Sequence, residues 1–266
     1  MLTKFRASLL DRLVLRPTRT PITQHCQKRS VVQLGKSSIE FYIQKNFNVG
    51  KNPDLLILKF PGTAGRAERS SPFPCDHFTD VNVEIWTWNP PGYGRSEGKA
   101  RLENIAATAT KFYNYARDSY GKHPVLWLMG NSLGCLSALC VAAETDAGLE
   151  TGIVLRNPPP LIPVVKKFAR KYHLAWTINS VAASLCDPMN AMLTAPRCHS
   201  PALFLQSELD TLVPVHLQNE IIKLYGGESH TVVLEGIGHD DKLTVDHQVQ
   251  VIDKLRWLWS VTRKTR

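Results

Sequence analysis

The chain has 266 residues, of which 43% are hydrophobic and 21% are charged, and its net charge is +9 at pH 7. This length and composition are typical of one large globular unit that buries its core without needing disulfides. No apolar run reaches membrane-spanning length, and no aromatic residues alternate with the basic ones, which argues against a membrane span and against nucleic-acid binding.

The first 30 residues are predicted to form a basic extension. An apolar residue recurs at helical spacing over residues 2–15, which predicts a short helix ended by Pro17. The segment lacks the apolar core of a signal peptide, so we expect a cytoplasmic protein, with an organellar transit peptide or a peripheral membrane location as alternatives. The cations either attract an anionic membrane or acidic substrates, or form an ordinary solvated surface.

After the extension, the sequence predicts a hairpin followed by a parallel sheet. Val31–Leu34 and Ile39–Ile43 flank Gly35 and Lys36, a pattern that favours a β-hairpin. Six short apolar runs with little alternation follow, as expected of strands buried on both faces. These runs are Leu55–Phe60, Val81–Trp88, Val125–Met129, Ile153–Leu155, Ala202–Gln206 and Thr231–Leu234.

Helical patterns lie between the predicted strands. Leu102 to Ala116, Ser132–Glu144, Val215–Tyr225 and His247–Trp259 repeat apolar residues at helical spacing. Such alternation of strands and helices predicts an α/β fold with a mostly parallel central sheet and helices on both faces. We expect residues 1–266 to form a single domain of this kind.

The pentapeptide Gly130-Asn131-Ser132-Leu133-Gly134 lies between the apolar run Val125–Met129 and a predicted helix. A serine in this G-x-S-x-G context sits on a sharp turn, where the flanking glycines let the backbones approach closely. The turn exposes the hydroxyl at the carboxyl end of the strand, beside the positive end of a helix. The pattern therefore predicts Ser132 as a nucleophile.

The interval from about residue 158 to residue 200 shows no strand pattern and is long for a connection. It contains predicted helices over Val164–His173 and Ala175–Leu185. We expect a short helical cap over the carboxyl ends of the strands, where open α/β sheets bind ligands. Trp176 and Phe168 are candidate substrate-binding residues in it. The alternative is a packing insertion with a solvated basic face.

A serine hydroxyl needs an adjacent base, and an acid and then a histidine typically follow it along the chain. His239 lies in a glycine-rich turn after the last predicted strand, which makes it the candidate base. Asp210 lies just past Ala202–Gln206 and is the candidate acid that orients this histidine. Glu208, two residues closer to the strand, is its rival.

The six cysteines are scattered, with no C-x-x-C pair and no zinc-ligand spacing. This distribution predicts reduced thiols in a reducing compartment, and no metal site.

Several motifs in a fixed order resemble the α/β-hydrolase superfamily, within it the esterase- and prolyl-oligopeptidase-like group with a small cap. They span the chain from about Leu55 to its C-terminus. The chain departs from the pattern in two places: it has Phe60-Pro61-Gly62 where many members have His-Gly after the strand, and Asn131 where many have histidine before the nucleophile. The motifs are Phe60-Pro61-Gly62-Thr63, Asn89–Ser96, Gly130–Gly134, Ser207–Asp210 with Val213-Pro214, and Gly236–His239.

The resemblance implies an acyl-enzyme mechanism that needs no cofactor and no metal. It assigns the oxyanion hole to the backbone N–H groups of Thr63 and Leu133, since Pro61 has no N–H. We expect hydrolysis of a carboxylic ester or thioester of a small-molecule or lipid-like acyl substrate. The alternatives are an amidase, peptidase or acyltransferase that uses the same residues, and a non-catalytic binding protein.

Overall fold

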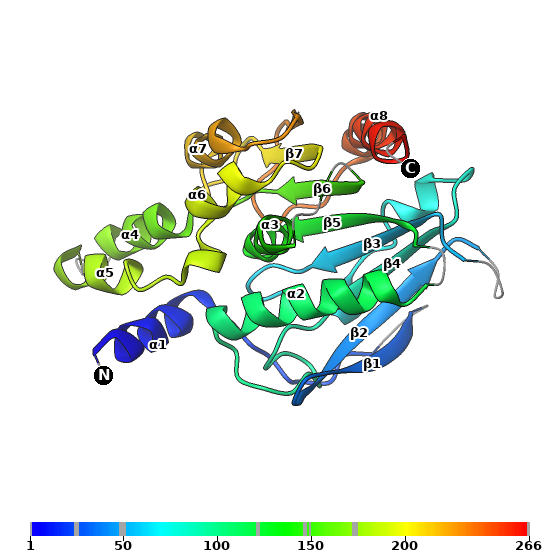
Figure 1. Cartoon of the computed structure of the whole chain (residues 1–266). Helices are drawn as coiled ribbons and strands as arrows, with labels where there is room; N and C mark the ends of the chain where they lie inside the picture. Colours follow the sequence, from blue (N-terminus) through cyan, green and yellow to red (C-terminus); the bar gives the residue numbers. More distant parts are fainter. Residues whose placement is uncertain are drawn as a thin grey trace.

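The computed structural model describes residues 2–23, 27–47, 52–120, 123–145, 148, 150–171 and 175–264, and of these the side chains of 170, 171 and 175–177 lie outside the description. Its strands form an eight-stranded sheet in the order β1-β2-β4-β3-β5-β6-β7-β8 (Figure 1). The strands are β1 (Lys28–Leu34), β2 (Ser37–Lys45), β3 (Leu55–Phe60), β4 (Val83–Trp88), β5 (Val125–Asn131), β6 (Thr151–Arg156), β7 (Ala202–Ser207) and β8 (Ser229–Leu234).

The sheet is antiparallel at one edge and parallel elsewhere. β1 and β2 pair as a hairpin around Gly35, whose φ of 68° suits a residue without a Cβ. β2 pairs antiparallel with β4, and every pairing from β4 to β8 is parallel. This arrangement confirms the predicted fold class.

The inner parallel strands are buried on both faces, which explains why their sequences do not alternate, whereas the edge strand β8 has exposed residues such as Val233. All six residues of β3 are buried. Leu56 and Leu58 pack in the core cluster of one face, whereas Leu55 and Ile57 pack in that of the other. Since each face needs apolar side chains, the strand reads as one continuous apolar run.

Helices supply the cover for these faces. α2 and α3 pack in the first core cluster and α8 in the second, and Figure 1 shows α8 away from α2 and α3. The helices are α1 (Leu2–Val14), α2 (Leu102–Asp118), α3 (Gly134–Glu144), α4 (Leu161–Lys171), α5 (Ala175–Ala182), α6 (Ala191–Thr194), α7 (Val215–Leu224) and α8 (Val245–Thr262).

The basic N-terminal segment packs against the rest of the molecule. Leu10 and Leu15 are 2% and 4% exposed and belong to the main core. The carboxylate of Asp11 accepts a hydrogen bond from the N–H of Leu102 at the start of α2. Residues 10–15 therefore contribute to the core.

The described part of the segment between β6 and β7 contains helices and turns but no strand. It contains α4, α5 and α6, with 3₁₀ turns at Asp187–Met189 and Ala195–Arg197. The sequence patterns predicted α4 and α5 but not the shorter α6. Met189 and Ala191 are fully buried and pack in the same core as α3, so the second half of the segment is anchored to the body.

The strand order places a topological switch beside β5. After β3 the chain crosses to β4 on one side, and after β5 it continues to β6 on the other. Loops that diverge in this way leave a crevice at the carboxyl ends of the two strands, where α/β sheets bind ligands. Ser132 follows β5 at that crevice.

Candidate active site

Ser132 occupies a sharp turn between β5 and α3. Its φ of 51° lies in the left-handed region, which is rare for a residue with a side chain. A Cβ on Gly134 would lie 1.9 Å from the carbonyl oxygen of Phe60, and one on Gly130 would lie 2.5 Å from Cα of Cys135. Both glycines are therefore required by the close approach of the backbone around the serine.

Hydrogen bonds join Ser132, His239 and Asp210. Nε2 of His239 lies 2.8 Å from Oγ of Ser132, and Nδ1 lies 2.6 Å from Oδ2 of Asp210. Ser132 is 9% exposed, and the side chains of His239 and Asp210 are 9% and 0% exposed. The structure thus brings together the three side chains that the sequence selected, from loops after three different strands.

The carboxylate of Asp210 is fixed on both oxygens. Oδ1 accepts hydrogen bonds from the N–H groups of Leu212 and Val213, at 2.9 Å and 2.8 Å. Oδ2 is hydrogen-bonded to Nδ1 of His239 and accepts a longer hydrogen bond, of 3.5 Å, from the side-chain amide of Gln218. These donors leave the carboxylate one orientation, in which Oδ2 faces the imidazole.

Glu208, the rival acid, contacts a different group. Its Oε2 accepts a hydrogen bond of 2.8 Å from the N–H of Gly236, at the start of the histidine loop. It therefore supports the backbone of the loop that carries His239.

The loop after β3 lies against the serine turn. A Cβ on Gly62 would come within 3.3 Å of Cβ of Ser132, so Thr63 follows a residue in close contact with the nucleophile turn. Among the described residues, no backbone or side-chain oxygen accepts a hydrogen bond from the N–H of Thr63 or of Leu133. Thr63 and Leu133 therefore stay our prediction for the two oxyanion donors.

Tyr93 connects this loop to the N-terminal segment. Its hydroxyl donates to the carbonyl of Thr63 at 2.9 Å and accepts from the N–H of Arg16 at 3.1 Å. Tyr93 is 1% exposed, and burial raises the pKa of its hydroxyl to about 12. The hydroxyl therefore stays protonated at neutral pH and keeps both hydrogen bonds.

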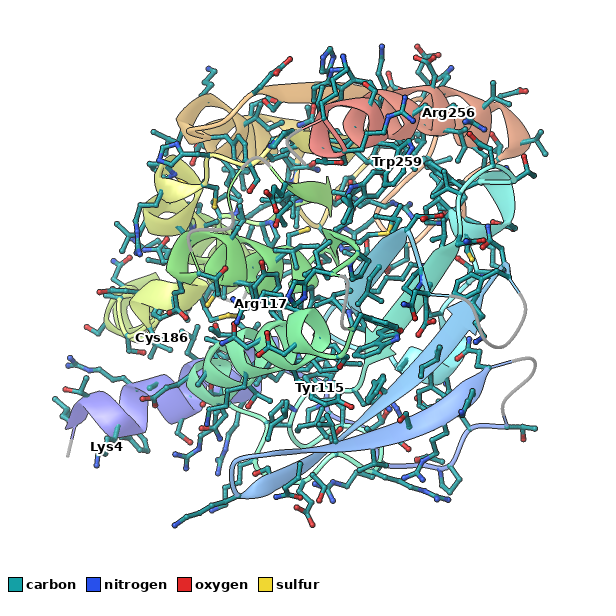
Figure 2. All side chains as sticks on the ribbon, turned by 45° about the vertical axis from the view of Figure 1, so that its right-hand side comes forward. Lys4, Tyr115, Arg117, Cys186, Arg256 and Trp259 are labelled. Carbon is teal, nitrogen blue, oxygen red and sulfur yellow. The ribbon has the colours of Figure 1, made fainter. Side chains whose placement is uncertain are left out.

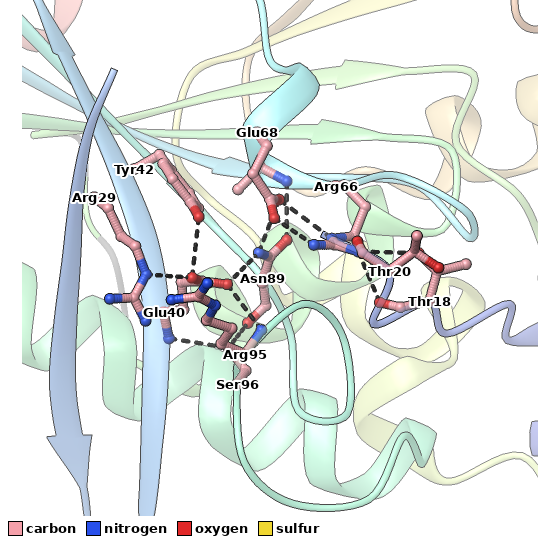
Figure 3. Close-up of polar contacts among 11 residues, drawn as sticks. Thr18, Thr20, Arg29, Glu40, Tyr42, Arg66, Glu68, Asn89, Arg95 and Ser96 are labelled. Carbon is pink, nitrogen blue, oxygen red and sulfur yellow. Dashed lines mark hydrogen bonds and ion pairs between the residues drawn. The ribbon is translucent and has the colours of Figure 1, made fainter. Parts of the chain in front are cut away.

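A buried polar network holds the far side of the same loop (Figure 3). Nδ2 of Asn89 donates to Glu40 at 2.8 Å and to Glu68 at 3.0 Å, and its Oδ1 accepts the N–H of Ala67. Arg66 pairs with Glu68 and donates to the carbonyls of residues 18 and 20. The network ties the Asn89–Ser96 turn, the loop after β3 and the N-terminal segment together.

The carboxylate of Glu40 accepts four hydrogen bonds in this network, two on each oxygen. Burial works to raise its pKa, but hydrogen bonds to the ionised form outweigh burial and hold the pKa below its ordinary value. The donors, in order of effect, are Arg29, the N–H of Arg95, Asn89 and Tyr42.

Two residues at the end of β6, which sequence reasoning missed, hold the histidine loop. Nδ2 of Asn157 lies 3.3 Å from the carbonyl of His239, and its Oδ1 accepts the N–H of Ser207. The guanidinium of Arg156 donates to the carbonyl of Asp241 at 2.6 Å. Asn157 is fully buried, and its φ of 52° is a conformation that asparagine tolerates well.

The segment between β6 and β7 contacts the acid loop through α4. Val164 packs in a small cluster with Val213 and Leu217, and Nζ of Lys167 donates to the carbonyl of Thr211 at 2.7 Å. Phe168 is 38% exposed. Trp176 lies on α5, but its side chain is outside the described residues. The substrate roles of these two aromatic residues remain predictions.

The described residues contain no cluster of histidine, cysteine or acidic side chains that could hold a metal ion. The helices described are all too short or too polar to cross a membrane.

Among known proteins, no family model matches the chain. It is 24% identical over 209 residues to an uncharacterized protein of Mycobacterium tuberculosis, an alignment that covers 78% of this chain and 69% of the relative.

Two solved structures are similar over nearly their whole length. An esterase of Pyrococcus furiosus has a TM-score of 0.69 at 14% identity, with 92% of this chain and 98% of that one covered. Acetyl xylan esterase 1 of a Thermoanaerobacterium species has a TM-score of 0.63 at 10% identity, with 97% and 93% covered. With this sheet order and this serine turn, the chain has the fold of the α/β-hydrolase superfamily.

Proposed function

We propose that this protein is a serine hydrolase that cleaves a carboxylic ester or thioester through an acyl-enzyme intermediate. One observation carries the proposal: the hydrogen-bonded chain from Oγ of Ser132 through His239 to Asp210, with distances of 2.8 Å and 2.6 Å. A serine on a left-handed turn, a base at bonding distance and a fixed carboxylate are what nucleophilic catalysis requires.

In the proposed reaction, Oγ of Ser132 attacks the acyl carbonyl while Nε2 of His239 takes the hydroxyl proton. Asp210 holds the proton on Nδ1 and stabilises the imidazolium that forms. The N–H groups of Thr63 and Leu133 bind the oxyanion. The imidazolium then protonates the leaving alcohol or thiol. Water, deprotonated by the same histidine, releases the carboxylic acid and regenerates the serine.

Several of the solved structures to which this fold is similar are described as esterases and one as an acylaminoacyl peptidase, so we favour ester cleavage and keep amide cleavage as the alternative. Amide cleavage and acyl transfer use the same three residues. A binding protein without activity would not need a base and an acid aligned on a serine.

The test is turnover of soluble acyl esters of graded chain length by the wild-type protein and by Ser132→Ala. We expect the wild type to hydrolyse at least one short or medium ester and Ser132→Ala to lose this activity by several orders of magnitude. Ser137→Ala, which changes a buried serine on α3, is the matched control and should retain activity.

Esters, thioesters and amides that share one acyl group then separate the chemistries, and an added alcohol acceptor detects acyl transfer. Faster amide cleavage would make the protein an amidase. No turnover of any acyl compound, with the fold intact, would leave the binding protein as the correct account.

A further inference from the structure

Helix α1 presents apolar side chains to solvent on the side that does not face the core. Leu10 and Val14 are buried, whereas Leu2, Phe5 and Leu13 are 63%, 61% and 49% exposed. With 100° per residue, these three exposed side chains share one stripe, together with the half-buried Leu9. The helix is thus anchored by one face and carries an unburied apolar stripe on another.

Cations border this stripe. Arg6 and Arg12 are adjacent in sequence to Phe5 and Leu13, on its two sides. Figure 2 shows Lys4 at the outer end of α1. Among the described residues, no carboxylate pairs with Lys4, Arg6 or Arg12. Asp11 is the one acidic residue of the helix, and its carboxylate accepts a hydrogen bond from the N–H of Leu102.

An open groove lies beside the stripe, between α1 and α5. It has a volume of about 350 Å³ and is lined by Arg6 together with hydroxyl and amide side chains. A guanidinium among such donors suits a phosphate oxygen. The other groove-lining residues are Thr3, Asn179, Ser180, Ala183 and Ser184.

We propose that the protein docks on an anionic phospholipid bilayer through α1. The exposed apolar side chains would enter the boundary of the acyl chains, and the flanking cations would meet lipid phosphates. An apolar stripe edged by lysine and arginine, with no free acid, is the pattern of helices that lie in a membrane interface. Nucleic acid would use the cations but would leave the apolar stripe in water.

Docking through α1 is connected to the proposed catalytic site. Arg16, just beyond α1, reaches the carbonyl of Thr63 through the hydroxyl of Tyr93. α1 also packs against α5 of the cap, and Figure 1 shows α1, α4 and α5 on the same side of the molecule. A bilayer bound at α1 would therefore lie on the cap side.

Sedimentation with vesicles tests the proposal. We expect the full chain to bind vesicles of phosphatidylcholine mixed with phosphatidylglycerol, to bind phosphatidylcholine alone weakly, and to be released by salt. Leu2→Ser with Phe5→Ser should weaken binding at least about tenfold. Arg6→Ser with Arg12→Ser should abolish most of the salt dependence.

The matched controls lie on α8, on the opposite side of the molecule from α1 (Figures 1 and 2). Val245 and Val249 are 75% and 66% exposed, and Lys254 and Arg256 each pair with an aspartate. Val245→Ser with Val249→Ser, and Lys254→Ser with Arg256→Ser, should bind vesicles like the wild type.

Turnover of a soluble ester and the thermal unfolding midpoint should be unchanged in the α1 variants, which keeps this test independent of the proposed activity. Absence of binding to anionic vesicles overturns the proposal. So does equal loss of binding in the α8 controls. A dimer that Leu2→Ser with Phe5→Ser converts to monomer, without vesicle binding by either form, would show that a second copy covers the stripe instead.

Discussion

Asp210 and Glu208 lie two residues apart, yet their carboxylates act on different parts of the histidine loop. Asp210 meets the ring nitrogen of His239, whereas Glu208 meets the backbone of Gly236. Both residues follow the end of β7, but their exposure differs: Asp210 is buried, with 4% of its surface exposed, whereas Glu208 lies at the surface. Substitutions at the two positions should therefore have different effects on activity.

Replacing the proposed acid should cost far more than replacing its neighbour. We expect Asp210→Asn to lower kcat by about 10⁴, because an amide favours the histidine tautomer that cannot accept the serine proton. Glu208→Gln keeps an oxygen for the N–H of Gly236 and should change kcat less than tenfold. Steady-state kinetics on one soluble ester measure both, and the opposite ranking would reassign the acid to Glu208.

Asn157 offers a second prediction at this scale, as a positioning residue. Asn157→Gly keeps the left-handed backbone but removes the amide that reaches the carbonyl of His239 and the N–H of Ser207. A histidine displaced by a fraction of an ångström should lower kcat by about 10–100-fold. KM should change little, because Asn157 is fully buried. A variant with a lower unfolding midpoint but an unchanged kcat would limit Asn157 to a structural role.

At the scale of elements, the strands could be predicted from the sequence closely. Burial on both faces makes the inner parallel strands nearly continuous apolar runs, so Leu55–Phe60 coincides with β3, and the ends of the other predicted runs lie within a few residues of the observed strand ends. The serine turn could be predicted because its strand, glycines and helix are adjacent in sequence. Asp210 and His239 could be predicted as partners of the serine because each lies just after a predicted strand.

The strand order and the short helix α6 could not be predicted from the spacing of apolar residues. The strand order puts β4 outside β3, and it makes β6 the neighbour of both the nucleophile strand and the acid strand. Because β6 pairs with β7 and β7 pairs with β8, Asn157 at the end of β6 lies close enough to contact the loop after β8. α6 was missed because its 4 residues are too few to show a helical repeat.

The proposed role of the segment between β6 and β7 as a cap can be tested on α4. If α4 selects the substrate, Phe168→Ala should shift the preferred acyl length, because apolar side chains set the depth of acyl pockets. Leu193→Ala on α6, where the leucine is 47% exposed, is the control and should leave the preference unchanged. The measurement is kcat/KM over a series of esters. Identical profiles for the three proteins would mean that α4 is a packing element.

For the molecule as a whole, the buried network around Glu40 couples stability to pH. The folded state holds the pKa of Glu40 below its ordinary value of about 4.5. The stabilisation from this group is therefore fully present above about pH 4.5 and is lost as the pH falls through the folded-state pKa. Below that range the carboxylate of Glu40 is protonated and no longer carries the negative charge that its hydrogen-bond donors stabilise.

Urea unfolding of the wild type and Glu40→Gln at a series of pH values measures this contribution. We expect the wild type to be more stable at pH 7 and the difference in unfolding free energy to shrink steadily below pH 4.5. A difference that stays constant across this range would show that the ionisation of Glu40 does not contribute to folding stability.

In the proposed reaction the hydroxyl of Ser132 forms a covalent bond with the acyl group, and locating such a bond on the protein tests the mechanism. A fluorophosphonate reacts with an activated serine and leaves a stable adduct, which peptide mass spectrometry assigns to one residue. We predict stoichiometric labelling of the wild type on the peptide that contains Ser132, no labelling of Ser132→Ala, and strongly slowed labelling after His239→Ala. Labelling of the folded Ser132→Ala protein at the wild-type rate, on Ser137 or any other residue, would contradict the account.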